Sequence, residues 1–153
     1  MKSTPAFTTT SRNRQLAREH AHIREAIEAV VSRLERTADH PEDRSALADL
    51  LEQVVSFREH LERHFWLEEA GGLLGDAVQY YAPEARRKAE ELVTEHRDFE
   101  RRIARINEQL YQALHDPLGL RRAPALDLSD LLRDLTDHER AETELSGRLL
   151  LGG

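Results

Sequence analysis

Cysteine is absent from the 153-residue chain, and this absence limits the chemistry open to it. Without thiols there is no disulfide, no thiolate nucleophile, and no cysteine-held zinc or iron–sulfur site. Any metal must therefore bind to nitrogen and oxygen ligands. Glycine and proline number only seven and five. They occur in clusters, so long uninterrupted segments lie between them.

Long apolar runs and basic stripes are also missing. No run approaches the ~20 apolar residues that span a bilayer, and the first ten residues lack the apolar core of a signal peptide. Lys and Arg number 22 against 29 Asp and Glu, and they are scattered among the acids, whereas nucleic-acid binding needs clustered basic residues. We expect a cytoplasmic protein of one domain, monomeric or weakly homo-oligomeric, that binds neither nucleic acid nor a membrane.

Four long segments carry apolar residues at the three- and four-residue spacing of amphipathic helices, and no segment alternates as a strand does. The segments are 12–37, 41–70, 83–114 and about 127–151. Such helices, joined by short connections, predict an all-α fold: an up-down-up-down antiparallel four-helix bundle built from two repeated helical hairpins. We expect the bundle to cover residues 12–151, after a flexible N-terminal tail over 1–11, with a short helix or crossover at 73–81.

Histidine is abundant, with eight in the chain, and an internal repeat organises four of them. An offset of 76 aligns the third segment with the first, and an offset of 74 aligns the fourth with the second. The aligned polar pairs are Glu19/Glu95, His20/His96, His64/His138 and Glu68/Glu142. Residues four apart share a helix face, so four imidazoles and two carboxylates are predicted to point into the bundle. Burying them is costly unless they pair or bind metal.

The predicted set of ligands limits which metals could bind. Four histidines and two glutamates are too many for one tetrahedral zinc and too rich in nitrogen for magnesium or calcium. They suit two octahedral ions with two histidines each and both glutamates bridging. Iron is the expected metal, and manganese or a mixed pair is the alternative. The Glu-x-x-His motif of ferritin-like di-iron bundles is absent. Three residues before the histidines stand Ala17, Leu61, Val93 and Leu135.

With His20, His64-x-x-x-Glu68, His96 and His138-x-x-x-Glu142 in this order, the chain resembles the hemerythrin-like (HHE cation-binding) family over about 16–150. The resemblance implies a four-helix bundle with two oxo- or hydroxo-bridged iron ions. In that arrangement Glu68 and Glu142 bridge both irons, and each iron takes two of the four histidines. Which histidines share an iron stays open.

The chain departs from the oxygen-carrying hemerythrins at two positions. Those proteins have His-x-x-x-His on the third helix and His-x-x-x-x-Asp on the fourth, where this sequence has Glu100 and Thr143. The chain is more similar to the bacterial subgroup associated with iron–sulfur repair and with the response to nitric oxide or peroxide.

The remaining polar residues near the motifs have more than one interpretation. His60 lies one turn before His64. It could form a hydrogen bond to a metal-binding residue, be an additional metal ligand, relay protons, or lie at the edge of the bundle. Glu69 is turned by ~100° from Glu68 and could contact a ligand from outside. We expect Glu100 to face water and Trp66 and Tyr111 to serve packing. Three further histidines are expected to be solvated: His22, His40 and His115.

Three functions are compatible with this sequence, because one fold can carry several activities. The first is a di-iron protein that binds or reduces a small oxidant, dioxygen, hydrogen peroxide or nitric oxide, in stress response or iron homeostasis. The second is a non-catalytic module that binds or senses dioxygen or iron. The third is a structural bundle that binds no metal. The sequence indicates no particular electron donor.

Overall fold

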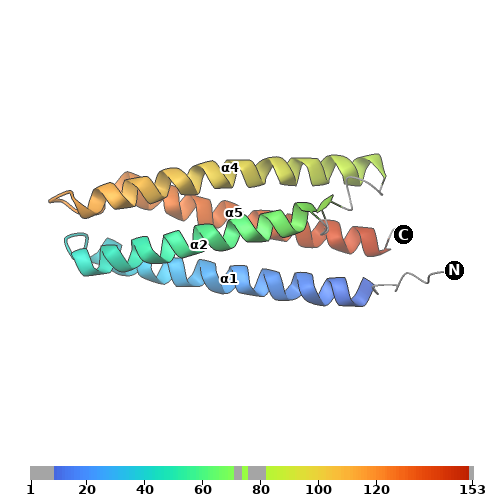
Figure 1. Ribbon diagram of the computed structural model, residues 1–153, viewed down its shortest axis with the longest axis horizontal. Coiled ribbons are helices and arrows are strands. Elements are labelled where there is room, and N and C mark those ends of the chain that lie inside the picture. Colours follow the sequence, from blue (N-terminus) through green and yellow to red (C-terminus); the bar gives the residue numbers. More distant parts are fainter. Residues whose placement is uncertain (1–8, 71–73, 76–81, 152–153) are drawn as a thin grey trace.

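The computed structural model describes residues 9–70, 74–75 and 82–151, and its long elements are four helices. They are α1 (Thr9–Asp39), α2 (Arg44–Ala70), α4 (Pro83–Leu114) and α5 (Arg122–Leu151). Successive helices run in opposite directions, and the start of α1 lies at the same end of the bundle as the end of α5 (Figure 1). The contacts connect α1 with α2, α2 with α4, α4 with α5, and α1 with α5. The predicted all-α four-helix bundle is thereby confirmed.

Two of the predicted segments lie partly outside the residues that the structure describes. Helix α1 begins at Thr9, inside the segment 1–11 for which the sequence predicts a flexible tail, and residues 1–8 lie outside the described part. The short helix or crossover expected at 73–81 also lies outside it, except for Leu74 and Gly75, which are helical. None of the helices in the described ranges is both long and apolar enough to cross a membrane.

Helix α2 begins at Arg44, later than the start of the predicted segment 41–70. The prediction that Pro41 lies in the first helical turn is therefore wrong, because Asp43 caps the helix. Its Oδ1 accepts hydrogen bonds from the backbone N–H groups of Ser45 (3.0 Å) and Ala46 (3.1 Å). These bonds satisfy two donors that the first helical turn leaves without partners, so the helix starts directly after Asp43.

Helix α5 begins earlier than expected, at Arg122 rather than near Asp127. Pro124 lies in its first turn, where the backbone N–H has no partner within the helix, so proline costs no hydrogen bond there. Helix α4 begins at Pro83, as the sequence predicts, with proline again in the first turn.

The apolar core is divided into two clusters along the bundle. The larger cluster fills the end that carries the short α1–α2 and α4–α5 connections, and it includes Ile23, Phe65, Phe99 and Leu135. The smaller cluster lies at the other end and consists of Leu74, Ala89, Leu92 and Leu145. Along α4 and α5 the two clusters are separated by one layer of buried polar side chains. This division fixes the level at which any polar site must lie.

At the end with the short connections, the α1–α2 loop packs closely against the α4–α5 loop. Gly119 has a φ of 67°, and a Cβ at this position would overlap the carbonyl oxygen of Pro41. Arg44 also donates hydrogen bonds to the carbonyl oxygens of Leu114 and Asp116. The close approach therefore depends on a residue without a side chain.

We expect Gly119→Ala to lower the free energy of unfolding by more than about 2 kcal/mol, because it adds both a strained left-handed backbone and a clash with Pro41. Chemical denaturation measures the loss. Gly147→Ala is the matched control. This glycine lies inside α5 with no atom within 4 Å of an added Cβ, so alanine should stabilise the helix by up to about 1 kcal/mol. Equal effects of the two substitutions would contradict the role given to Gly119.

Candidate metal centre

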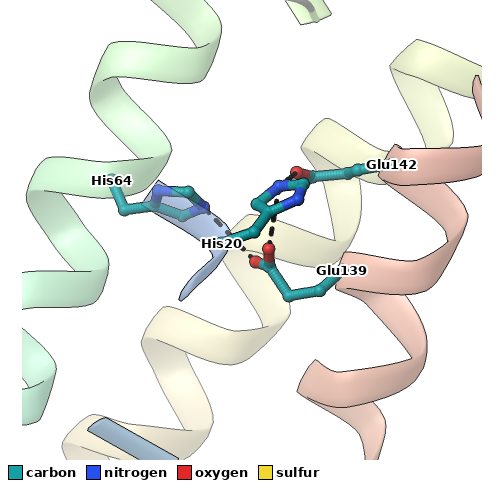
Figure 2. Close-up of side chains that lie close together, drawn as sticks. All are labelled: His20, His64, Glu139 and Glu142. Carbon is teal, nitrogen blue, oxygen red and sulfur yellow. Dashed lines mark hydrogen bonds and ion pairs between the residues drawn. The ribbon is translucent and has the colours of Figure 1, made fainter. Parts of the chain in front are cut away.

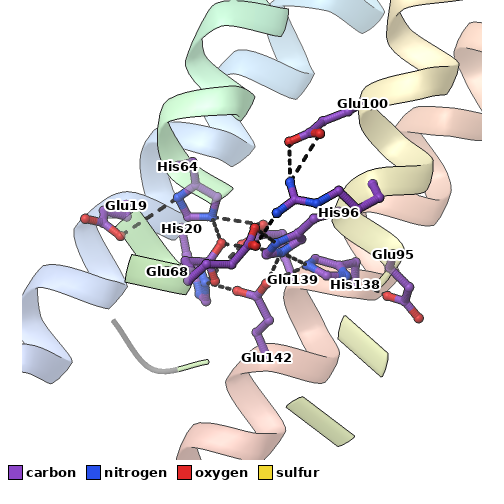
Figure 3. A network of polar contacts seen from close by, with 12 residues as sticks. Glu19, His20, His64, Glu68, Glu95, His96, Glu100, His138, Glu139 and Glu142 are labelled. Carbon is purple, nitrogen blue, oxygen red and sulfur yellow. Dashed lines mark hydrogen bonds and ion pairs between the residues drawn. The ribbon is translucent and has the colours of Figure 1, made fainter. Parts of the chain in front are cut away.

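Seven ionisable side chains form the buried polar layer, and every helix contributes to it. Each is less than a tenth exposed: His20, His64, Glu68, His96, His138, Glu139 and Glu142. All six predicted metal ligands lie in this layer, together with Glu139, which was not among the predicted residues (Figure 3). Isolated buried charges of this kind would be strongly unfavourable, so the layer needs compensating partners.

One group of donors lies between α1, α2 and α5 (Figure 2). His20 Nε2 is 2.9 Å from Glu139 Oε2 and 3.2 Å from Glu142 Oε2. His64 Nε2 is 3.3 Å from Glu139 Oε1 and 2.7 Å from Glu68 Oε1. The imidazoles of the first hairpin therefore share a set of carboxylates supplied mainly by α5.

A second group lies between α4 and α5. The Nε2 atoms of His96 and His138 are 3.0 Å apart, and they lie 3.3 Å and 2.5 Å from Glu142 Oε1. Two atoms bound to one ion at about 2.1 Å and at right angles are about 3.0 Å apart. The spacing of these donors therefore suits a single ion held by His96, His138 and Glu142.

Two carboxylates connect the groups. Glu142 turns Oε2 toward His20 and Oε1 toward His96 and His138. Glu68 Oε1 lies 2.7 Å from His64 Nε2 and 3.9 Å from His96 Nε2. The structure thus groups His20 with His64 and His96 with His138, one pair for each hairpin, with Glu142 and Glu68 between them.

The outward nitrogens of the second histidine pair are held by carboxylates. His96 Nδ1 lies 3.0 Å from Glu69 Oε2, and His138 Nδ1 lies 2.6 Å from Glu95 Oε2. An ionised carboxylate can only accept a hydrogen bond, so Nδ1 donates its proton outward. The Nε2 lone pair is then free to bind a metal, which is the usual arrangement of metal-binding histidines.

The first pair has weaker outward partners. Thr143 Oγ1 donates to the carbonyl oxygen of Glu139 (3.0 Å), which leaves its lone pair free to accept from His20 Nδ1 (3.3 Å). His64 Nδ1 lies 3.8 Å from Glu19 Oε2. All four imidazoles therefore direct Nδ1 to a partner outside the layer and Nε2 to its centre.

Several of the nitrogen and oxygen atoms that point into the layer have no hydrogen-bond partner. They are His64 Nε2 and both carboxylate oxygens of Glu68 and of Glu139. His64 Nε2 and Glu68 Oε1 are close but are not aligned as a hydrogen bond. Orphaned buried atoms that converge at bonding distance are what a cation would satisfy. The residues present therefore fit a pair of metal ions with nitrogen and oxygen ligands.

The carboxylates shift the proton affinities of the imidazoles. Burial alone would lower the pKa of His20 and of His64, but the close, negatively charged carboxylates of the nearby glutamates outweigh it. Glu139 and Glu142 raise the pKa of His20 to about 9. Glu139 and Glu68 raise that of His64 to about 11. Without a metal, protons therefore provide the positive charge that this layer requires.

The three carboxyl groups respond differently to the same surroundings. Burial and the neighbouring Glu142 raise the pKa of Glu68. For Glu142 burial acts in the same direction, but the adjacent Glu68 carboxyl and the neighbouring imidazoles hold its pKa well below the usual value. For Glu139, His20 and His64 likewise outweigh burial and lower the pKa. The surroundings therefore favour the protonated form of Glu68 and the ionised forms of Glu142 and Glu139.

The other predicted residues lie outside the two donor groups. His60 is half-buried, belongs to neither group, and has a pKa lowered by burial and by the charges of Arg63, His64 and His22. Glu100 binds Arg97 at 3.0 Å. Three further histidines are exposed: His22, His40 and His115. The two aromatic residues Trp66 and Tyr111 are also exposed, so the packing role expected for them is wrong for most of their surface.

Helical spacing does not indicate Glu139 as an inward residue, because it directly follows His138 and so is turned away by about 100° on the helix. A signal was present in the repeat. The offset of 74 aligns Glu139 with Phe65, a core residue with no exposed surface. A carboxylate at the repeat position of a buried phenylalanine could have been recognised as facing inward.

A surface cavity of about 330 Å³ reaches the second group from outside. It lies between α4 and α5, and its lining includes Glu95, Phe99 and His138. Because His138 is itself buried, this cavity is a short route between solvent and the polar layer.

A comparison with protein families matches residues 12–149 to the model of the hemerythrin HHE cation-binding domain. The match includes α2 and α4, most of α1 and α5, and both donor groups. The comparisons with curated proteins and with solved structures found no match.

The raised pKa values predict how the metal-free protein responds to pH. His20 and His64 bind protons more tightly in the folded than in the unfolded chain, so their contribution to stability is complete below pH 6.5. It is lost as the pH rises through about 9 and toward about 11. We expect the melting temperature of chelator-treated protein to fall between pH 6.5 and about 9.5. His64→Gln should flatten this dependence, and equal slopes for the variant and the parent would contradict the assignment.

Proposed function

Because the chain belongs to the hemerythrin HHE cation-binding family, we propose that its buried polar layer holds two iron ions and that the loaded protein binds or reduces a small oxidant. The candidate oxidants are hydrogen peroxide, nitric oxide and dioxygen. Such chemistry fits a role in stress response or in iron homeostasis.

The observation that carries this proposal is the pair of donor groups joined by Glu142. In the proposed assignment His20, His64 and Glu139 hold one ion, and His96 and His138 hold the other, with Glu142 and Glu68 shared. Two neighbouring positions with nitrogen and carboxylate donors favour iron over zinc, whose structural sites are single, tetrahedral and closed. They also disfavour magnesium and calcium, which select oxygen.

With iron bound at both positions, oxidation of the pair from Fe(II) to Fe(III) would supply the two electrons that, together with two protons, reduce hydrogen peroxide to two waters. The chain's own groups have separate tasks. Glu95 Oε2 accepts a hydrogen bond from His138 Nδ1, and its side chain is 47 % exposed, so it connects the buried imidazole to solvent. Phe65 and Phe99 line the apolar side of the layer and limit the entry of water.

A second candidate is an iron-dependent sensing module without turnover. It is favoured by the depth of the layer, since His96 and Glu142 have no exposed surface and the surrounding helices must close over the ions. In such a module the stability of the bundle, rather than a product, would report the presence of iron.

Anaerobic addition of Fe(II) to metal-free protein should give two bound ions per chain, measured by native mass spectrometry. Binding only to the folded chain raises its stability, by about 2.7 kcal/mol when free Fe(II) is about 100-fold above Kd. Glu142→Gln should lose both ions because it removes the shared carboxylate. The matched control His22→Gln, at an exposed position of α1, should retain both. His60→Gln should also retain both, since His60 lies outside the donor groups.

The oxidant can be tested by a single turnover, which needs no electron donor. We expect one hydrogen peroxide to be consumed for every two Fe(II) oxidised in the loaded protein, followed by the optical spectrum and by residual peroxide. Reversible spectral changes with dioxygen or nitric oxide, without oxidation of iron, would instead support the sensing module. A folded wild-type chain that binds no Fe(II) would contradict both candidates.

A further inference from the structure

The outward partners of the histidines follow the same repeat as the ligands. Glu19 approaches His64 in the first hairpin, and its repeat partner Glu95 approaches His138 in the second. The residue after each shared glutamate also has an equivalent position: Glu69 contacts His96, and Thr143 contacts His20. The two halves of the layer are therefore related position by position.

This relation is broken at the residue that follows the histidine of α2 and of α5. In α5 this residue is Glu139, whose oxygens lie 2.9 Å from His20 Nε2 and 3.3 Å from His64 Nε2. In α2 it is Phe65, whose ring stacks on His96 with centroids 3.9 Å apart and an angle of 12° between the planes. Phe65 thus has, beside the second histidine pair, the place that Glu139 has beside the first.

The difference changes both the donor count and the charge. The carboxylate of Glu139 is buried, neither of its oxygens has a hydrogen-bond partner, and its inward neighbours are the two imidazoles. The phenyl ring of Phe65 provides no donor atom and presents an apolar face to His96. One position therefore has an additional anionic ligand, and the other has an apolar wall.

We propose that Glu139 makes the two metal positions unequal, so that the position at His20 and His64 binds Fe(II) first and more tightly than the position at His96 and His138. This inference rests on the proposed iron centre. It adds to that proposal an order of loading and one residue that sets it. At limiting iron the chain would then hold a single ion in its first hairpin.

The contacts around His96 oppose this order only in part. Its outward partner is the carboxylate of Glu69, whereas His20 has the hydroxyl of Thr143. A carboxylate partner makes an imidazole a stronger ligand, but it acts through the ring and leaves the number of donors unchanged. A direct negative ligand on the ion at His20 and His64 outweighs it.

Anaerobic calorimetric titration with Fe(II) tests the inference on the full chain. We expect two steps in the wild type, the first tighter by at least about 10-fold, since even a residue that only supports a ligand typically changes metal affinity 10–100-fold. Glu139→Gln should weaken the first step by at least that factor. Glu144→Gln, at an exposed position of α5, is the matched control and should leave both steps unchanged.

Two ligand variants assign the steps to positions, with ions per chain counted by native mass spectrometry and helix content by circular dichroism. His96→Ala should retain the tight step and lose the weak one, and His20→Ala should do the reverse. Two equal steps in the wild type would overturn the inference while leaving the iron centre intact. So would a folded Glu139→Gln that titrates like Glu144→Gln, or a His96→Ala that loses the tight step. Absence of any Fe(II) binding would overturn the proposed function, and this inference with it.

Discussion

The structure depends on the need to balance seven ionisable groups buried in one layer of the bundle. Four imidazoles and three carboxylates are enclosed between two apolar clusters, where water cannot solvate them. Their own attraction compensates only part of this cost, as the partnerless atoms of His64, Glu68 and Glu139 show. Protons satisfy the layer in the metal-free chain, and cations of higher charge would satisfy it better. The apolar clusters on either side hold the helices in register, so the donors remain aimed at common points.

An antiparallel bundle makes such a layer with few residues. Each helix crosses the level of the layer once, so one histidine per helix provides four imidazoles at the same height. The four-residue step from His64 to Glu68, and from His138 to Glu142, adds a carboxylate one turn further along the same face. The outward partners come from a neighbouring helix in the pairs Glu69–His96, Glu95–His138 and Glu19–His64. Each imidazole is thus oriented by a contact that also joins two helices, and the contacts that orient the donors belong to the packing of the bundle.

Helical periodicity explains which parts could be predicted from the sequence. The three- and four-residue spacing fixes which residues face inward, so the fold class and the burial of His20, His96 and Glu142 follow from spacing alone. Helix ends depend on local hydrogen bonds, which the spacing does not contain. The cap by Asp43 therefore places the start of α2 later than predicted. Glu139 could not be predicted in this way, because the spacing assigns one inward residue to each helical turn. Helix α5 buries two consecutive residues at this level, His138 and Glu139. The grouping of histidines by hairpin depends on side-chain directions across the bundle, which spacing along one helix does not contain.

Glu100 and Glu139 together explain how this donor set differs from that of the oxygen carriers that the sequence resembles. Where those proteins have a second histidine on the third helix, Glu100 turns outward and binds Arg97, which in turn binds Glu69 at 2.5 Å. Glu100 therefore supports the partner of His96 and gives no ligand to the layer. The additional donor comes from α5 instead, as the carboxylate of Glu139 on the opposite histidine pair. If the layer holds iron as proposed, an anionic oxygen has replaced a neutral nitrogen in the set. A negative ligand stabilises the more highly charged Fe(III) state over Fe(II). On the proposed iron centre, the exchange would therefore favour giving electrons to an oxidant over holding dioxygen reversibly.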